Sequence, residues 1–237
     1  MPALIEDMSA KVASGYLVGG LSSSRATPFQ VANEVIEGGL SGVVLSSGIE
    51  LATRLTQGCT PLPAKHVVTE GQRNIIVALD GRPALDVLQE EIAAASERDF
   101  HRAVHSIHVG LPVPGSDTGD YLVRNLIGID PQSRLIAIGA PIEPGMSIMF
   151  CRRDGASARE DLGRMLDVIA RHLEGPPKGG LYYSCLGRGE QMFGRRSAEL
   201  EIVRDRLGDF PLAGFFCNGE ISHDRLYGYT GVLTLFR

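Results

Sequence analysis

Two short apolar runs that end in turns with cysteine and glycine constrain the fold of this chain most strongly. The first is LYYSCLGRG, residues 181–189, and the second is LAGFFCNGE, residues 212–220. Each run is typical of a buried strand that feeds a tight loop, and residues 198–207 between them have the spacing of an amphipathic helix. A strand, a helix and a strand over this length predict a βαβ unit, with parallel strands and a right-handed crossover.

The parallel arrangement brings the ends of both strands to one edge of the predicted sheet. The loops that follow Tyr183 and Phe216 would emerge side by side, where ligands of open α/β sheets usually bind. Gly187, Gly189 and Gly219 in these loops tolerate positive φ angles and let a ligand approach backbone N–H groups. We expect the two turns to face one crevice, although such glycines most often serve plain tight turns.

The remaining patterns predict an α/β fold of the mixed α+β kind, with mixed β-sheets flanked by helices and a C-terminal βαβ unit. The periodic pattern dissolves into charged residues between 96 and 102, which predicts two domains, residues 1–95 and 96–237. The last strand is expected to close the sheet. Helices are expected at residues 4–12, 83–95, 157–173 and 198–207, and the last of them has Leu200, Val203 and Leu207 on one side. Strands are expected at residues 16–21, 42–45, 66–69, 74–79, 107–111, 121–129, 135–138, 146–151 and 228–236, with an antiparallel meander from 107 to 151. Loops are expected at residues 56–63 and 112–120.

Two local signals refine this prediction. Ser157 and Glu160 have the spacing of a capping box at the start of the most regular helix, while the preceding Asp154 would favour the helix dipole. Arg152 and Arg153 beside it serve either the crevice or only the helix start. Residues 38–45 also echo residues 227–235 in spacing, which is a weak indication of two related halves.

Composition excludes several classes of function. The formal net charge of -5 argues against a nucleic-acid surface, and no apolar run approaches the length of a membrane span. The four cysteines are widely spaced without a CxxC pair, which fits reduced thiols and a cytoplasmic location. GRGEQM lacks the third glycine of a dinucleotide fingerprint and the phosphate-binding GxxxxGK[ST] pattern does not occur, so no cofactor is expected.

Arg188 and Glu220 are the charged residues of the two turns. Arg188 offers two parallel donors for a carboxylate, while Glu220 is able to accept an ammonium group. Together they predict a site for a zwitterion such as a free amino acid. The equally weighted alternative is that the two side chains pair with each other or with other loop residues.

Ser184 and Cys185 carry an alternative prediction, a serine or thiol hydrolase. An exposed thiol beside Arg188 would have its thiolate favoured. However, no histidine is close in the sequence and the GxSxG pattern is not matched. We favour Cys185 as a wall of the pocket, and interpret Cys217 in the same way.

His101, His105 and His108 would converge as metal ligands on one helical face. Residues 107–111 have a strand pattern, which breaks that geometry. We therefore expect no metal site.

Several segments resemble the FIST family of signal-transduction proteins. GGLYYSCLGRGEQMFG, PLAGFFCNGEIS, LYGYTGVLTLF, YLVRNLIGIDP and MFCRRDGASAREDL resemble its C-terminal domain, from about Ile107 to Phe236. VGGLSS, TQGC, HVVTE and NIIVALDGRPAL resemble the end of its N-terminal domain, which would be considerably longer when complete.

The resemblance implies a non-enzymatic sensory module that binds small ligands, amino acids among them, and that works with a signalling protein as partner. Its oligomeric state is not predicted. A third hypothesis, a protein-interaction scaffold, predicts a wide exposed apolar patch instead of a closed pocket. The positions expected to bind the ligand are Ser184, Cys185, Gly187, Arg188, Gly189, Gly214, Phe215, Gly219, Glu220 and Thr230.

Overall fold

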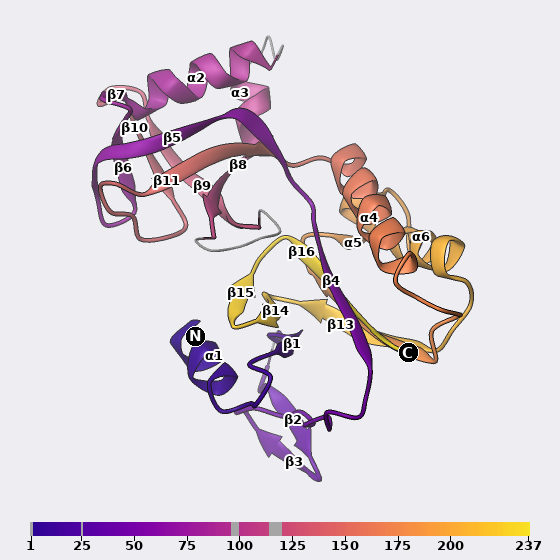
Figure 1. Cartoon of the computed structure of the whole chain (residues 1–237). Helices are drawn as coiled ribbons and strands as arrows, with labels where there is room; N and C mark the ends of the chain where they lie inside the picture. Colours follow the sequence, from indigo (N-terminus) through magenta and orange to yellow (C-terminus); the bar gives the residue numbers. More distant parts are fainter. Residues whose placement is uncertain (1, 25, 96–99, 114–119) are drawn as a thin grey trace. The chain divides into compact units, whose positions relative to one another are not determined.

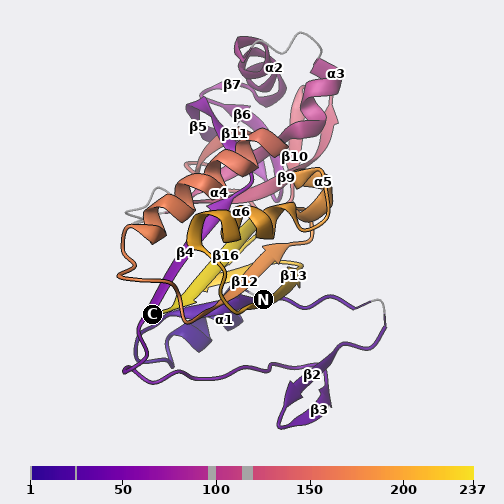
Figure 2. The ribbon, with the colours of Figure 1, turned by 90° about the vertical axis from the view of Figure 1, so that its right-hand side faces the viewer.

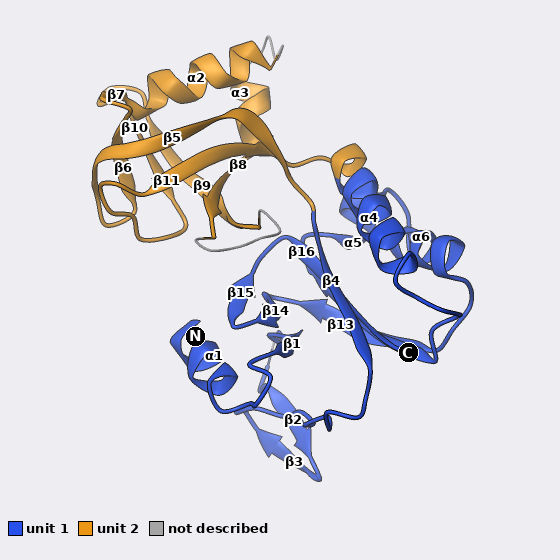
Figure 3. Cartoon of the chain, in the orientation of Figure 1, with its two compact units in different colours: residues 1–57, 158–237 blue, residues 58–157 orange. Residues whose placement is uncertain are grey.

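The computed structural model describes residues 2–24, 26–95, 100–113 and 120–237 (Figure 1). The chain divides into two compact units, one made of residues 1–57 and 158–237 and the other of residues 58–157 (Figure 3). We describe each unit by itself. The division into family domains at residues 1–95 and 96–237 stays a prediction.

The unit of residues 58–157 is built on a closed antiparallel sheet. Its strands follow the order β10-β9-β8-β11-β5-β6-β7, and a further pairing between β10 and β6 closes six of them into a ring. The predicted meander is confirmed, since β8, β9 and β10 pair in succession and β11 returns beside β8. The strands are β5 (Thr60–Gln72), β6 (Ile75–Leu79), β7 (Arg82–Pro83), β8 (Ile107–Pro112), β9 (Tyr121–Asp130), β10 (Leu135–Ile138) and β11 (Ser147–Arg152).

The core of this unit follows from the alternation of side chains along the strands. Val68, Ile136, Ile138 and Phe150 are fully buried, because every second residue of a strand faces the same side. Helix α2 (Ala84–Ala94) adds Leu88 and other apolar residues to this core, as its predicted periodicity requires. Helix α3 (Phe100–Ala103) and a 3₁₀ turn (Val104–Ser106) lead into β8.

The unit of residues 1–57 and 158–237 contains the predicted βαβ element. A four-stranded sheet has the order β13-β12-β16-β4, and β12 and β13 are parallel while the other pairs are antiparallel. Helices α4 and α6 cover one face of this sheet (Figures 1 and 2). The elements are β4 (Leu51–Gln57), α4 (Gly155–Ala170), β12 (Gly179–Cys185), α5 (Gly189–Phe193), α6 (Ala198–Leu207), β13 (Leu212–Cys217) and β16 (Thr230–Phe236).

The N-terminal segment completes this unit with small sheets. β1 (Leu17–Gly20) pairs antiparallel with β14 (Glu220–His223), and β15 (Arg225–Tyr227) follows on the other side of β14. Helix α1 (Pro2–Ser9) precedes β1. β2 (Phe29–Ala32) and β3 (Glu34–Glu37) form a separate hairpin.

Gly20 allows the close approach of β1 to the end of β13. A Cβ atom at Gly20 would lie 2.1 Å from the Cys217 sulfur, so only glycine fits there. The N-terminal segment is thereby held against the turn that carries Glu220.

Three predictions about strands are wrong. Residues 42–45 lie in no strand, and Val43 and Val44 are 83% and 87% exposed, so the echo of residues 227–235 is not an equivalence of structure. The predicted loop at 56–63 contains the end of β4 and the start of β5. Pro63 lies where the pairing of β5 with β11 shifts register, and such an irregularity tolerates proline. The final strand β16 lies inside the sheet, between β12 and β4.

Two helix predictions also need correction. Helix α1 ends at Ser9, before Val12. On α6, Leu200 is 46% exposed, and the buried positions are Ala198, Glu199, Val203 and Leu207.

The predicted loop 112–120 lies largely outside the described residues, because 114–119 are not described.

Helix α4 begins with a cap that differs from the predicted one. It starts at Gly155, and the carboxylate of Asp154 accepts hydrogen bonds from the Ser157 backbone N–H at 2.8 Å and from the Ser157 hydroxyl at 3.1 Å. Asp154 also pairs with Arg152 at 2.9 Å. Ser157 is therefore the third helical residue, and Asp154 is the cap.

This cap gives a testable prediction. Asp154→Ala removes the acceptor for an otherwise unpaired N–H group and should lower the free energy of unfolding by about 1 kcal/mol. Ser157→Ala keeps that acceptor and should cost less. Urea denaturation of both variants measures the difference, and a larger loss for Ser157→Ala would restore the capping box.

Candidate functional site

The turns that follow β12 and β13 leave the sheet at the same edge. β12 and β13 pair in parallel from Gly180 with Leu212 to Cys185 with Cys217, so both chains turn at the same level. The two strand ends thus carry Arg188 and Glu220 on adjacent loops, as the βαβ pattern predicts. The structure divides their side chains, however, between two environments.

Ser184 and Cys185 mark this division. They are consecutive residues of β12, so their side chains point to opposite faces of the sheet. Ser184 contacts Glu199 of α6 on the helix-covered face. Cys185 interacts with Glu220 on the other side.

A buried hydrogen-bond network surrounds Glu199 on the helix-covered face. Its Oε1 atom accepts from the Tyr182 hydroxyl at 2.6 Å and from Arg188 Nε at 2.7 Å. Its Oε2 atom accepts from the Ser184 hydroxyl at 3.0 Å. The carboxylate is therefore held by three donors from β12 and the following turn, and it replaces Glu220 as the partner of Arg188.

Arg188 is almost completely enclosed. The residue is 1% exposed, and its guanidinium lies 5.2 Å from the centre of the Phe193 ring. Burial by itself would lower the pKa of Arg188, but Tyr182 and Glu199 more than offset this and keep the guanidinium charged. Nη1 and Nη2 have no hydrogen-bond partner among the described residues, although both atoms are buried. Two strong donors are thus left without acceptors.

Glu220 has the complementary feature on the other side. Its Oε2 atom accepts from the backbone N–H of Thr230 at 3.1 Å and from the Thr230 hydroxyl at 2.7 Å. Its Oε1 atom is buried without a hydrogen-bond partner among the described residues. Burial raises the pKa of Glu220 to about 7, against the opposing effects of the hydrogen bonds from Thr230 and Cys185 and of the charge on Arg188. Thr230 therefore positions this carboxyl group, which titrates near neutral pH.

The cysteines do not have the chemistry of nucleophiles. Burial, with Glu220 nearby, raises the pKa of Cys185, and burial raises that of Cys217 to about 12. All four cysteines are free and buried. The expectation that Arg188 favours a thiolate at Cys185 is wrong, because Arg188 is bound to Glu199 and the sulfur lies beside a carboxyl group.

The glycines of the two turns have distinct structural roles. Gly189 and Gly219 have φ angles of 56° and 129°, which side chains of other residues rarely allow. A Cβ atom at Gly214 would lie 1.8 Å from the backbone oxygen of Tyr182. The backbone N–H of Gly187 is directed to the Cys185 sulfur. Each of these roles holds the strand ends in place whether or not a ligand binds.

A cavity of about 590 Å³ lies on the helix-covered side of β12 and β13; we call it the helix-side cavity. Of the predicted site residues, Ser184, Gly189, Gly214 and Phe215 line it, whereas the other six do not. Its lining consists of Tyr182, Ser184, Gly189, Glu190, Arg195, Arg196, Ser197, Ala198, Glu199, Leu200, Leu212, Ala213, Gly214, Phe215 and Phe216.

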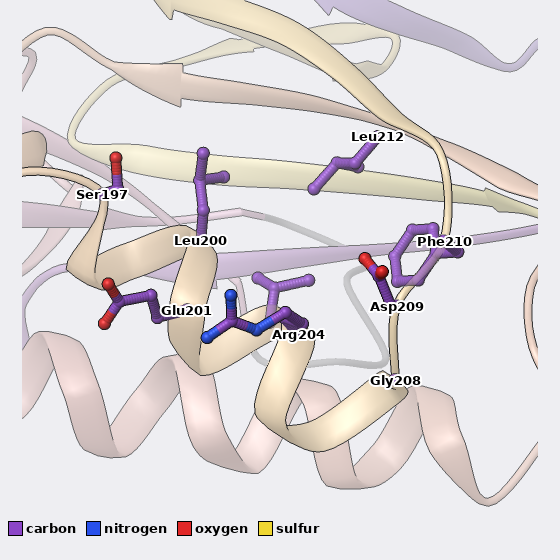
Figure 4. Close-up of a pocket in the computed structure, with 9 residues that line it drawn as sticks. Ser197, Leu200, Glu201, Arg204, Gly208, Asp209, Phe210 and Leu212 are labelled. Carbon is purple, nitrogen blue, oxygen red and sulfur yellow. The ribbon is translucent and has the colours of Figure 1, made fainter.

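A second hollow of about 300 Å³ continues along α6 toward residues 208–212; we call it the α6 hollow (Figure 4). Leu200 of α6 and Leu212 of β13 border both hollows, together with Ser197. The two hollows therefore run along the same side of β13.

The sequence interpretation missed Glu199 and Tyr182. A signal was present, because Glu199, Val203 and Leu207 follow the i, i+4 spacing of one helix face. All three are buried. A glutamate in line with core residues indicates a buried carboxylate that needs donors, and Tyr182 and Ser184 in the preceding strand supply them.

The other candidates are separate from this site. His101 lies in α3, His105 in the 3₁₀ turn and His108 in β8, so they share no helical face. Among the described residues, no cluster of three or more His, Cys, Asp or Glu side chains could hold a metal ion. Within the same part of the chain, no helix is long and apolar enough to cross a membrane.

The buried pair of Arg188 and Glu199 gives a prediction for stability. Glu199→Ala leaves a buried guanidinium without its carboxylate and should cost roughly 3–5 kcal/mol of unfolding free energy. Glu201→Ala is the matched control on the same helix, because its partner Arg195 is exposed and the loss should be small. Urea denaturation compares them, and equal losses would show that the buried pair has no special role.

The raised pKa of Glu220 predicts a pH dependence. The folded state holds this proton up to about pH 7, whereas the unfolded chain releases it near pH 4.5, so ionisation favours unfolding between these values. The contribution of Glu220 to stability is complete below pH 4.5 and falls by roughly 3 kcal/mol as the pH rises through 7. Glu220→Gln should remove this decline. Unfolding free energies of both proteins from pH 4.5 to 8 test the difference, and parallel curves would contradict it.

The chain matches two domain families along its length. Residues 2–82 match the FIST N domain and residues 84–223 match the FIST C domain. FIST domains are sensory domains of signal transduction.

Two mycobacterial relatives extend this comparison. An uncharacterized protein of Mycobacterium tuberculosis (strain ATCC 25618 / H37Rv) is 35% identical over 247 residues, which cover 98% of this chain and 64% of the relative. An uncharacterized protein of Mycobacterium bovis is 32% identical over 235 residues, which cover 95% of this chain and 60% of the relative. The chain thus spans less than two thirds of the length of either relative. The matches to the FIST N and FIST C domains show that the chain belongs to the FIST family.

Proposed function

We propose that this chain is a sensory module of signal transduction that binds a small zwitterionic ligand, a free amino acid, at the ends of β12 and β13. One observation carries the proposal. Arg188 and Glu220 stand on adjacent turns at the ends of parallel strands, the charge on Arg188 acts on the Glu220 carboxyl group, and each side chain has buried polar atoms without a partner among the described residues. A ligand with a carboxylate and an ammonium group would satisfy both.

The Arg188 side of the site favours a carboxylate. Nε is engaged by Glu199, which fixes the guanidinium and leaves Nη1 and Nη2 as a pair of donors. Such a pair matches the two oxygens of a carboxylate. A ligand carboxylate would remove the cost of two buried donors without acceptors, which favours the bound state.

The Glu220 side favours an amine. Oε2 is engaged by Thr230, so Oε1 is the atom left for a ligand. An ammonium group beside the carboxylate would lower its pKa from about 7, because an opposite charge favours the ionised form. Binding of an amino acid below pH 7 would therefore release a proton from Glu220.

Access requires a small movement of the first turn. Arg188 and Glu220 are enclosed, while Leu186 next to them is half exposed. The helix-side cavity reaches Ser184 and Glu199, the residues grouped around Arg188. In this proposal the turn of residues 186–189 opens to admit the ligand, Cys185 forms part of the wall, and Gly187, Gly189 and Gly219 let the backbone approach it.

The hydrolase alternative has less support. The Ser184 hydroxyl donates to Glu199, and the pKa of Cys185 is raised, so neither group is prepared for attack. The described residues that shift the pKa of Cys185 are Glu220, Gly187 and Tyr229, and no histidine is among them. We therefore propose a binding role rather than catalysis, with a signalling protein as partner. A cytoplasmic location, consistent with the free cysteines, belongs to the same proposal.

Isothermal titration calorimetry with the twenty L-amino acids tests the site. At least one should bind, and Arg188→Lys and Glu220→Gln should each weaken it roughly tenfold or more, because each removes a charge-assisted contact. Both changes keep a polar side chain of similar length. Arg171→Lys and Glu174→Gln, on the exposed surface, are the matched controls and should bind as the wild type does.

The proposal fails if no amino acid binds at millimolar concentration, or if the Arg188 and Glu220 variants bind as the controls do. The amide and the des-amino analogue of the bound amino acid separate the two contacts. The amide should respond less to Arg188→Lys, and the des-amino analogue less to Glu220→Gln.

A further inference from the structure

β13 is the outer strand of the four-stranded sheet. β12 is its neighbour on one side, and within the described part of the chain no strand pairs with the other side. An unpaired edge presents a row of backbone N–H and C=O groups that another strand can use. Proteins commonly cover such an edge or interrupt it with charge, but residues 212–217 contain neither a charged residue nor a proline.

The helix-side cavity extends around this edge. The consecutive residues 213–216 all line it, together with Leu212. Side chains of consecutive strand residues point to opposite faces, so a cavity on one face alone would be lined by every second residue. The cavity therefore opens onto the free backbone edge of β13.

Exposed apolar side chains form part of the cavity wall. Phe215 and Phe216 of β13 are 44% and 52% exposed, and Leu200 of α6 lines the same cavity. In Figure 4, Leu200 and Leu212 border the α6 hollow from the helix and the strand. Exposed apolar residues that gather beside a hollow mark an interaction surface. We call the helix-side cavity and the α6 hollow together the β13 groove.

The charge at one end of the β13 groove defines the occupant further. Arg195 is paired with Glu201, whereas Arg196 and Glu190, which also line the helix-side cavity, are exposed and form no ion pair among the described residues. A carboxylate on the bound segment would complement Arg196. The chain's own exposed segment, residues 40–46, carries no charge, and neither does β13 itself, so neither of these segments would supply that carboxylate.

We propose that the β13 groove binds an extended peptide segment of a partner protein, apolar at alternate positions and ending in a carboxylate, which adds to the sheet beside β13. The six residues of β13 span about 20 Å, enough to pair with a segment of similar length. Backbone pairing supplies affinity, and the groove accepts every second side chain. This surface goes beyond the small-ligand site and does not require Arg188 or Glu220.

A fluorescein-labelled peptide of sequence TVTFTVD with a free carboxyl terminus is the probe, and fluorescence polarisation on the whole chain is the measurement. The peptide should bind, and Phe216→Glu should weaken it roughly tenfold or more by placing a charge in the apolar wall. Phe29→Glu is the matched control, because Phe29 is exposed in the separate β2–β3 hairpin. Circular dichroism confirms that both variants are folded.

Two further peptides test strand addition itself. Backbone N-methyl groups are placed on either the odd or the even residues, since only every second residue of an added strand donates to β13. One series should lose binding and the other should keep most of it. The amidated peptide should bind more weakly than the free acid, and this difference should disappear in Arg196→Ala.

Several results would overturn the proposal. These are no binding at millimolar peptide, equal binding to Phe216→Glu and the wild type, or equal effects of the two N-methyl series. A dimer of the wild type that Phe216→Glu converts to a monomer would assign the groove to a second copy instead. Glu220→Gln separates the two proposals, because it should weaken amino-acid binding and leave peptide binding unchanged.

Discussion

The buried ion pair between Arg188 and Glu199 is the interaction on which the C-terminal site depends. A guanidinium that is 1% exposed is tolerated only if a carboxylate compensates its charge, and Glu199 does so from α6 at 2.7 Å. The same carboxylate receives the hydroxyl groups of Tyr182 and Ser184. The pair thereby ties α6 to β12 and fixes the turn that follows the strand. Because Nε alone engages Glu199, the arrangement stabilises the fold and leaves two donors unused.

Close backbone approach is the second constraint. Gly214 adjoins Tyr182 on the neighbouring strand, and Gly231 adjoins the Tyr182 ring, where a Cβ atom would lie 2.4 Å from the hydroxyl oxygen. Tyr182 therefore occupies space that two glycines leave open, and its hydroxyl reaches Glu199 as a result. Gly214, one of the positions expected to bind the ligand, therefore has a role in packing this tyrosine. The ligand proposal consequently rests on unpaired polar atoms, not on glycine content.

The sequence predicts the elements of this region well and their side-chain partners poorly. The βαβ unit follows from the lengths and periodicities of residues 179–217, and the structure confirms its parallel pairing. The ion-pair partner of Arg188 could not be predicted in this way. The sequence places Glu220 on the neighbouring loop, whereas the actual partner, Glu199, reaches Arg188 from helix α6. Alternation along β12 places Ser184 and Cys185 on opposite faces of the sheet, and the predicted strand already implies this separation. The prediction of a strand at 42–45 is wrong because a strand needs a neighbouring strand to pair with, and a local apolar pattern does not supply one.

The distribution of unsatisfied groups then separates two kinds of surface. At the strand ends the unsatisfied atoms are charged, enclosed and few, which favours a small ligand with matching charges. Along β13 they are the backbone groups of the unpaired edge, flanked by the exposed rings of Phe215 and Phe216, which favours an extended partner. Both surfaces share β13 and the turn before α5, so a ligand that moves residues 186–189 would also shift Gly189, which lines the helix-side cavity. A sensory module requires a connection between its ligand and its partner, and in the two proposals β13 and the turn of residues 186–189 would provide it.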